Sequence, residues 1–335
     1  ENGFIVTGSD TGDGEPIQYL KKLGVHIDSI HEAKNVENAD LVVYSSAVHQ
    51  DNPELVEAKT RRIPIIRRAE MLGELMRLKY TLAIAGTHGK TTTTSMVGAI
   101  WEKAGLDPTV IVGGIVKGKG SGAKVGRGSY LIAESDEFDR SFLSMMPSSA
   151  IITNIDEDHL DTYKNLEEIK NAFVEFANKV PFYGQAIVCL DDPNVQSILS
   201  RLTKPIITYG FSRQAMYRIE NLRPDQGYFA FDVYKNNEFL SSFKIKIAGR
   251  HNILNATASI ALAVEEQVPL NFISEAISSF EGVHRRFEYM GDYKGAEKDY
   301  SKALIIDNKL LAAYLNRAIM RDKLEDVTGA IADCN

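Results

Sequence analysis

Short apolar runs alternate with stretches of helical spacing along the first 80 residues. The runs FIVTGSD (residues 4–10) and ADLVVYSSAV (39–48) predict buried strands that each end in a polar turn. Helical spacing follows both runs, at IQYLKKLG (17–24) and from NPELVEA (52–58) onward. This rhythm predicts βαβ units with a parallel sheet, and we assign residues 1–79 to one partial domain.

Polar residues follow both of these predicted strands. In open α/β sheets, ligands lie beyond the carboxyl ends of the strands, so these positions are candidates for substrate contacts. The alternative, that they are turn and cap residues, fits the pattern equally well. The four candidates are Ser9, Asp10, Ser45 and Ser46.

A longer α/β pattern extends over residues 80–288, which we assign to a central domain. Residues 216–247 alternate with a period of two around Asn236-Asn237, which predicts an antiparallel section with a turn at that dipeptide. Buried strands are predicted at 81–86, 130–135, 150–155, 186–192 and 205–210, and helices at 90–105, at 166–180 and from 251.

The last 45 or so residues have helical spacing and no strand pattern. Gly295 and Gly329 lie 34 positions apart, as do Asp299 and Asp333. Because 34 residues is the period of tetratricopeptide repeats, we predict a short helical segment of that kind at 289–335. Such a segment would be a possible site for a protein partner.

Composition narrows the class of protein. The 335 residues are 44% hydrophobic and 25% charged, typical of globular domains, and the length suggests two or three of them. A net charge of −7 argues against nucleic acid as a partner. No run of about 18 apolar residues predicts a membrane span, and the first ten residues do not resemble a signal peptide. Cys189 and Cys334 show no metal-ligand spacing, which fits a reducing cytoplasm.

The stretch IAGTHGKTTTTSM (84–96) is close to a phosphate-binding loop between a strand and a helix. The general pattern G-x-x-x-x-G-K-[ST] requires glycine where Ile84 stands. Even so, glycines let backbone N–H groups approach phosphate oxygens, Lys90 can reach the β- and γ-phosphates, and the Thr91 hydroxyl can bind Mg²⁺. The alternative is a glycine turn capped by threonines. The candidate ATP-binding residues here are Gly86, Thr87, His88, Gly89, Lys90, Thr91 and Thr92.

Acidic residues follow two of the predicted strands of the central domain. Carboxylates are the ligands that Mg²⁺ prefers, so two acidic clusters on strands that flank a phosphate loop favour a metal site. A single acid after a strand would more often cap the next helix. The clusters are Glu134, Asp136, Glu137 and Asp139 after one strand, and Asn154, Asp156, Asp158, His159 and Asp161 after the other.

Several stretches in the same order resemble the Mur ligase family. They include AGTHGKTTTTSM, AESDEFDRSFL, TNIDEDHLDTY, PFYGQAIVCLDDPN, ITYGFS, GRHNILNATA and GVHRRFE. GSD at 8–10, YSSAVHQDNPEL at 44–55 and RAEMLGELMR at 68–77 resemble the end of that family's N-terminal domain. The resemblance covers about residues 1–288. The family's shorter loop, G-T-x-G-K-T, needs no glycine at position 84.

The resemblance implies a partial Rossmann-like domain and a central P-loop ATPase-type α/β domain, and the 34-residue spacing predicts a short all-α tail after them. It also implies an ATP-dependent ligase of peptidoglycan synthesis that joins L-alanine to UDP-N-acetylmuramate through an acyl phosphate. By match to the family motifs, Lys90, Glu134 and His159 are catalytic, and Thr91, Glu134 and His159 bind Mg²⁺. The matched nucleotide contacts are His251, Asn252, Asn255 and Arg286. Without the resemblance, Asn252 and Asn255 would be expected to cap a helix and Arg286 to be a solvated charge.

The chain also departs from the family pattern. The family has a glycine-rich loop that would precede Glu1, and a third domain that would follow RRFE (285–288). We therefore expect weak or absent ligation by this chain, with ATP–Mg²⁺ binding retained. Two alternatives stay open: the ligase of the same family that recycles murein tripeptide, and a scaffold with tetratricopeptide repeats that only binds ATP.

Overall fold

The computed structural model describes residues 3–45, 47–113, 123–138, 140–158 and 162–282, together with Ser301 and Arg317. Contacts divide the chain into two units, Glu1–Val283 and His284–Asn335, and all elements named below belong to the first. The predicted tetratricopeptide segment at 289–335 lies outside the described residues apart from Ser301 and Arg317, so it stays a prediction. No helix in the described part of the chain has the length and apolarity that a membrane crossing requires.

The N-terminal region forms two short strand pairs rather than one sheet. The pairs β1–β2 and β3–β4 are both parallel, as predicted. The runs 4–10 and 39–48 each contain a strand, as predicted, but both strands have only three residues and the expectation that they are buried is wrong. Val43, the middle residue of β3, is 43% exposed. Alternate side chains of a strand point to opposite faces, so Val43 points away from its half-buried neighbours. The elements are β1 Thr7–Ser9, α1 Glu15–Lys22, β2 His26–Asp28, η1 Ala33–Val36, β3 Val42–Tyr44, α2 Pro53–Arg61, β4 Ile65–Arg67 and α3 Arg68–Met76.

The next region is built on one ten-stranded sheet in the order β14-β13-β12-β11-β10-β9-β5-β8-β6-β7. Its elements are β5 Tyr80–Ala85, α4 Lys90–Lys103, β6 Thr109–Ile111, β7 Ala123–Lys124, β8 Tyr130–Glu134, η2 Ser141–Ser144, β9 Ser149–Ile152, α5 Leu166–Ala177, β10 Ala186–Cys189, α6 Pro193–Ile198, η3 Leu199–Arg201, β11 Ile206–Gly210, β12 Tyr217–Asp225, β13 Tyr228–Lys235, β14 Glu238–Ile245, α7 Arg250–Glu265 and α8 Leu270–Ser279.

Two kinds of strand pairing meet in this sheet. Strand β5 lies between β8 and β9 and is parallel to both. Strands β12, β13 and β14 form an antiparallel extension, with β14 at one end of the sheet. The turn between β13 and β14 falls at Asn236-Asn237, which have φ of 52° and 69°. The antiparallel section and its turn are therefore confirmed.

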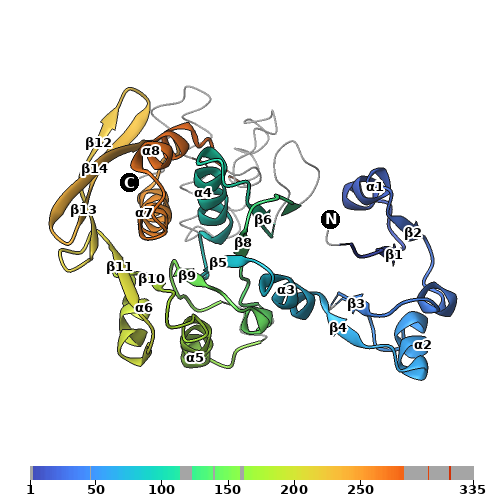
Figure 1. Ribbon diagram of the computed structural model, residues 1–335. Helices are drawn as coiled ribbons and strands as arrows, with labels where there is room; N and C mark the ends of the chain where they lie inside the picture. Colours follow the sequence, from blue (N-terminus) through green and yellow to red (C-terminus); the bar gives the residue numbers. More distant parts are fainter. Residues whose placement is uncertain are drawn as a thin grey trace. The chain divides into compact units, whose positions relative to one another are not determined.

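Helices cover both faces of the sheet. Figure 1 shows α4, α7 and α8 on one side of the strands and α5 and α6 on the other. Each side has its own apolar core. Helix α4 contacts α7 and α8 as well as the sheet, and its residues Met96, Val97, Ile100 and Trp101 have no exposed surface. Burial on this scale stabilises by roughly 1.5–3 kcal/mol for each large side chain, so it fixes the start of α4 at the carboxyl end of β5.

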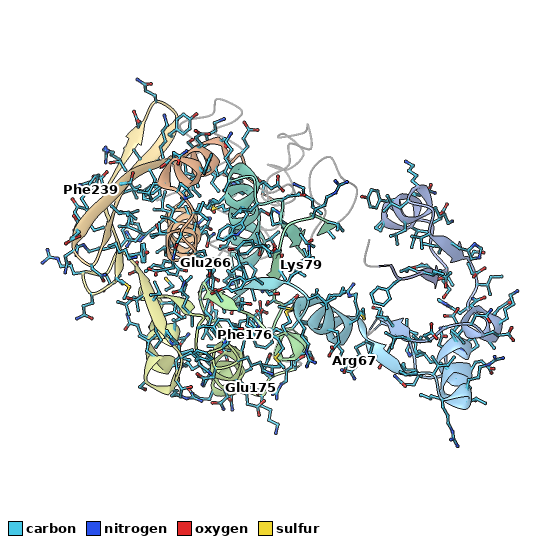
Figure 2. All side chains as sticks on the ribbon, in the orientation of Figure 1. Arg67, Lys79, Glu175, Phe176, Phe239 and Glu266 are labelled. Atoms are coloured by element: carbon cyan, nitrogen blue, oxygen red, sulfur yellow. The ribbon has the colours of Figure 1, made fainter. Side chains whose placement is uncertain are left out.

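A polar cluster lies at the other end of the same strands. Glu266, labelled in Figure 2, follows the last residue of α7. Its carboxylate accepts hydrogen bonds from Ser149 Oγ at 2.9 Å and from Tyr80 Oη at 3.2 Å. Burial raises the pKa of the Glu266 carboxyl, although the hydrogen bonds from Ser149 and Tyr80 oppose the shift. Helix α7 therefore spans from the carboxyl ends of the central strands to their starts.

We expect Glu266→Gln to change how stability depends on pH. A carboxyl group with a raised pKa binds more protons in the folded than in the unfolded chain, so wild-type stability falls as the pH rises from its ordinary value of 4.5 through the folded value. Glutamine does not ionise, so the variant should gain stability relative to wild type across this window. Melting temperatures between pH 4 and 8 measure the difference, with Glu275→Gln, an exposed carboxylate on α8, as control. Parallel profiles for Glu266→Gln and wild type would contradict the expectation.

Candidate functional site

The loop 86–89 connects β5 to α4 and needs glycine at both of its ends. Gly86 has φ of 133° and Gly89 has φ of 85°, both in the region that favours glycine. A Cβ at Gly86 would lie 2.0 Å from Thr153 Oγ1, and a Cβ at Gly89 would lie 2.7 Å from Asn255 Oδ1. The positive φ angles and the short distances to Thr153 and Asn255 together explain why the loop has glycine at both positions.

Residues that follow β9 hold the middle of the loop. Thr87 donates its N–H to Asn154 O at 3.1 Å, and its hydroxyl accepts from Asp156 N at 2.9 Å. Both backbone groups of His88 are bonded to the side chain of Asn154, at 2.8 and 2.9 Å. The His88 imidazole is 57% exposed, with Nε2 3.8 Å from the Asp156 carboxylate. The loop backbone is therefore fixed while the imidazole stays accessible.

Lys90 begins α4 and bends back over the loop. Its Nζ donates to Glu137 Oε2 at 2.8 Å, to Gly86 O at 2.8 Å and to Thr87 O at 3.3 Å. The side chains of Lys90 and Glu137 are 11% and 2% exposed, so this ion pair is largely shielded from water. The ammonium lies at a helix N-terminus, where the helix dipole also favours an anion. The arrangement suits a bound phosphate group, which would replace the carbonyl oxygens of Gly86 and Thr87 as hydrogen-bond acceptors of the Lys90 ammonium.

Two hard oxygens lie on the β8 side of the loop. Thr91 Oγ1 donates to Glu134 Oε1 at 3.0 Å, and Gly113 N donates to Glu134 Oε2 at 2.8 Å. No group of three or more His, Cys, Asp or Glu side chains that could hold a metal occurs among the described residues. Mg²⁺ does not need one, because it usually binds one or two protein oxygens, several waters and the phosphates of its substrate. Thr91 and Glu134 fit that role. Thr92 lies next to them in the first turn of α4, partly buried.

The start of α7 lies against the phosphate loop through one residue. Asn255 is 5% exposed, and its amide is the group that a Cβ at Gly89 would strike. Asn252 Nδ2 donates to Ala248 O at 2.6 Å, a helix-start contact. His251 is exposed. The structure thus brings Asn255 to the loop, whereas the Asn252 amide is engaged within its own helix start.

A second polar cluster lies beside the start of α7, at the ends of β10 and β11. Asp191 accepts the N–H groups of Phe211 and Ser212, both at 2.9 Å, and lies 3.8 Å from the Arg250 guanidinium. That guanidinium is 3.6 Å from the centroid of the Phe211 ring. Cys189, two residues before Asp191, is not a nucleophile candidate, because burial raises the pKa of its thiol to about 11.

The candidate substrate residues of the N-terminal region are engaged within their own fold. The Ser9 hydroxyl donates to Glu54 Oε2 at 2.7 Å and is 2.8 Å from His31 Nδ1. Asp10 is exposed and accepts from Gly12 N at 2.7 Å. Ser45 accepts from Ala47 N at 3.4 Å. The remaining candidates, Ser46, His159 and Arg286, lie outside the described residues, as do Asp139 and Asp161 of the two acidic clusters.

The contacts of Glu137, Asn154 and Thr153 with the loop were not predicted from the sequence. Glu137 and Asn154 belong to the polar clusters predicted after strands, but neither was assigned to the phosphate loop. Their positions directly after β8 and β9 were the available signal. The pattern could not show which backbone or side-chain group each would reach.

The family matches cover most of the chain. Residues 1–80 match "Mur ligase family, catalytic domain", and residues 84–263 match "Mur ligase middle domain". A UDP-N-acetylmuramate–L-alanine ligase of Geobacter sp. (strain M21) is 45% identical over 99% of this chain and 76% of its own length. The enzyme of the same name from Anaeromyxobacter dehalogenans (strain 2CP-C) is 51% identical over 88% of this chain and 64% of its own length.

Solved structures agree with these matches. UDP-N-acetylmuramate-alanine ligase MurC from Thermotoga maritima has a TM-score of 0.72 at 30% identity, and covers 89% of this chain and 71% of its own. A UDP-N-acetylmuramate:L-alanyl-gamma-D-glutamyl-meso-diaminopimelate ligase from Neisseria meningitides has a TM-score of 0.75 at 27% identity, and covers 84% and 92%. The chain spans 62–76% of the length of the curated relatives compared with it, and for most of them less than two thirds. The sequence matches, the shared fold and the loop geometry lead to one conclusion: this chain belongs to the Mur ligase family.

Proposed function

We propose that this chain is an ATP-dependent, amide-forming ligase of peptidoglycan synthesis that joins L-alanine to UDP-N-acetylmuramate. The observation that carries the proposal is the arrangement of Lys90, Thr91 and Glu134 around the loop 86–89. It occurs in a chain 45–51% identical to ligases with those two substrates in their names. We propose the division 1–79, 80–288 and 289–335 as substrate domain, ATP-binding domain and tail. The free, buried thiol of Cys189 fits a cytoplasmic location.

ATP would supply a phosphoryl group to the muramate carboxylate, which makes phosphate the leaving group when the alanine amine attacks. The protein's task is to hold two anions together and to exclude water. Lys90 would turn from the loop carbonyls to the phosphates and balance their charge. The N–H groups at the start of α4 would bind phosphate oxygens, because the first turn of a helix leaves its N–H groups without intrahelical partners.

We propose that Thr91 and Glu134 hold one Mg²⁺, which would offset charge on the transferred phosphoryl group. Their hydroxyl and carboxylate oxygens lie 3.0 Å apart, and Gly113 N orients the carboxylate. His159 is proposed for a second Mg²⁺ and Arg286 for the nucleotide phosphates by family match alone. Asn255 would fix the loop from the α7 side, with His251 and Asn252 toward the base and ribose. Ser9, Asp10, Ser45 and Ser46 remain proposed contacts of the UDP-linked substrate.

One assay tests the reaction. Phosphate release by the purified chain is measured with ATP, Mg²⁺, UDP-N-acetylmuramate and L-alanine, and each component is then omitted in turn. The proposal expects that any release requires all four, and the expectation of weak ligation concerns only how fast that release is. Release that continues without L-alanine or without UDP-N-acetylmuramate would contradict it. Because the chain is shorter than its relatives, ATP binding in the presence of Mg²⁺ is measured separately, with EDTA as the metal-free control.

A second candidate has a specific observation in its favour. The ligase structure from Neisseria meningitides, whose name contains the tripeptide L-alanyl-gamma-D-glutamyl-meso-diaminopimelate, has a TM-score of 0.75, against 0.72 for the Thermotoga maritima enzyme. Sequence identity favours L-alanine, at 30% against 27% for the two solved structures, and the curated L-alanine ligases reach 45–51%. Replacing L-alanine with L-alanyl-γ-D-glutamyl-meso-diaminopimelate in the assay separates the two, because the preferred amine gives the higher kcat/KM.

A further inference from the structure

The side-chain amide of Asn154 contacts both backbone groups of a single loop residue. Its Oδ1 accepts the His88 N–H at 2.8 Å, and its Nδ2 donates to His88 O at 2.9 Å. Thr153 Oγ1 donates to the same carbonyl at 2.6 Å. Only a side chain that carries a donor and an acceptor side by side can make this pair of contacts.

The sheet fixes where that amide lies. Asn154 comes two residues after Ile152, the last residue of β9, and Ile152 is in register with Ala85, the last residue of β5. Thr153 N continues the ladder with a bond to Ala85 O at 3.1 Å. Asn154 therefore lies on the segment that continues β9, next to β5, from which the loop 86–89 starts. The position of its amide does not depend on a bound ligand.

This contact decides which loop N–H groups are available to a ligand. The His88 N–H is committed to Asn154, so it does not point at a phosphate. The first N–H that donates within α4 is that of Thr93, to Gly89 O at 2.9 Å, so the N–H groups of Gly89 to Thr92 have no intrahelical acceptor. These four N–H groups follow directly after the His88 peptide, whose orientation Asn154 holds.

We infer that Asn154 is a positioning residue for the ATP phosphates: it locks the His88 peptide so that the N–H groups of residues 89–92 converge on the β- and γ-phosphates. The inference rests on the proposed function. It concerns only the phosphate end of the nucleotide, since Asn154 follows β9 and the proposed base contacts lie on α7. A merely structural role would affect adenosine and phosphate recognition alike.

Asn154→Ala tests the inference in the full chain through dissociation constants for ATP, ADP and AMP with Mg²⁺. We expect the constants for ATP and ADP to rise about tenfold, the size of one poorly directed charge-assisted hydrogen bond, and that for AMP to change less than twofold. Asn154→Asp should weaken ATP further, because it puts a second acceptor against His88 O and a negative charge beside the phosphates. In the nucleotide-free chain, amide hydrogen exchange at His88 should become at least tenfold faster in Asn154→Ala.

Asn194→Ala is the matched control. Asn194 Nδ2 donates to Ile155 O at 2.8 Å, so this variant also removes a hydrogen bond between an asparagine side chain and the segment after β9. The acceptor of that bond is Ile155, however, and not a residue of the loop 86–89. The nucleotide affinities of Asn194→Ala should stay within twofold of wild type. Equal losses for ATP, ADP and AMP in Asn154→Ala, or unchanged exchange at His88, would overturn the inference. Wild-type ATP binding that is insensitive to Lys90→Met would overturn the proposed function instead, and this inference with it.

Discussion

Lys90→Met is expected to weaken ATP binding by about 100-fold or more. The variant keeps a long side chain but loses the ammonium, and two charge-assisted hydrogen bonds to phosphate are worth about 3 kcal/mol together. Isothermal titration with ATP and Mg²⁺ measures the loss. Lys103→Met is the matched control, since Lys103 ends the same helix and pairs on the surface with Glu275 at 3.4 Å. That variant should bind ATP like wild type.

Loss of the ammonium also affects stability, and a double variant separates the two effects. Lys90 faces Glu137, which is 2% exposed, and removing one member of a shielded ion pair typically costs about 3–5 kcal/mol. Adding Glu137→Gln removes the opposing charge, so the melting temperature of the double variant should recover toward wild type. ATP affinity should not recover. If both recovered together, Lys90 would act through folding and not through phosphate.

Gly86→Ala is expected to destabilise the chain by about 2–5 kcal/mol and to abolish ATP binding. The new Cβ would lie 2.0 Å from Thr153 Oγ1 and 3.0 Å from Thr153 N, and the φ of 133° adds strain. Thr153 has little freedom to move, because its hydroxyl bonds to His88 O and its N–H to Ala85 O. Urea unfolding measures the change in the free energy of unfolding.

Gly105→Ala controls for backbone strain alone. Gly105 has φ of 74°, and nothing lies within 4 Å of its would-be Cβ. This variant should cost only about 1 kcal/mol and keep ATP binding. Equal effects at both positions would mean that crowding against Thr153 plays no part.

The parts of the fold that depend on residues close together in the sequence were predicted correctly from local patterns. The strand, loop and helix over 81–105 and the antiparallel section over 216–247 are both present, because each follows from spacing and turn residues within one segment. The N-terminal sheet was less predictable. Its apolar runs indicated strands, but among the described residues β3 pairs with β4 alone, and no local pattern encodes how many neighbours a strand will have.

The candidate site shows the same division. Gly86, Gly89, Lys90 and Thr91 lie within six residues, so the motif was visible in the sequence. The contact between Gly89 and Asn255 joins segments 166 positions apart, and it depends on how α7 packs against α4. Glu137 was one acid among several after β8, and only the folded backbone shows that it, and not Asp136, lies closest to Lys90, at 2.8 Å against 3.9 Å.

The antiparallel end of the large sheet has a consequence for self-association. Strand β14 is a terminal strand, and a terminal strand leaves one row of backbone N–H and C=O groups open to pairing with another chain. Lys244 is the second-last residue of β14, and Lys246 directly follows the strand; both side chains are exposed. Their ammonium groups lie 4.8 and 6.0 Å from the centroid of the Tyr228 ring. A strand from a second chain would have to bury these charges as it added to the sheet. The two lysines therefore disfavour the addition of another chain at this edge of the sheet.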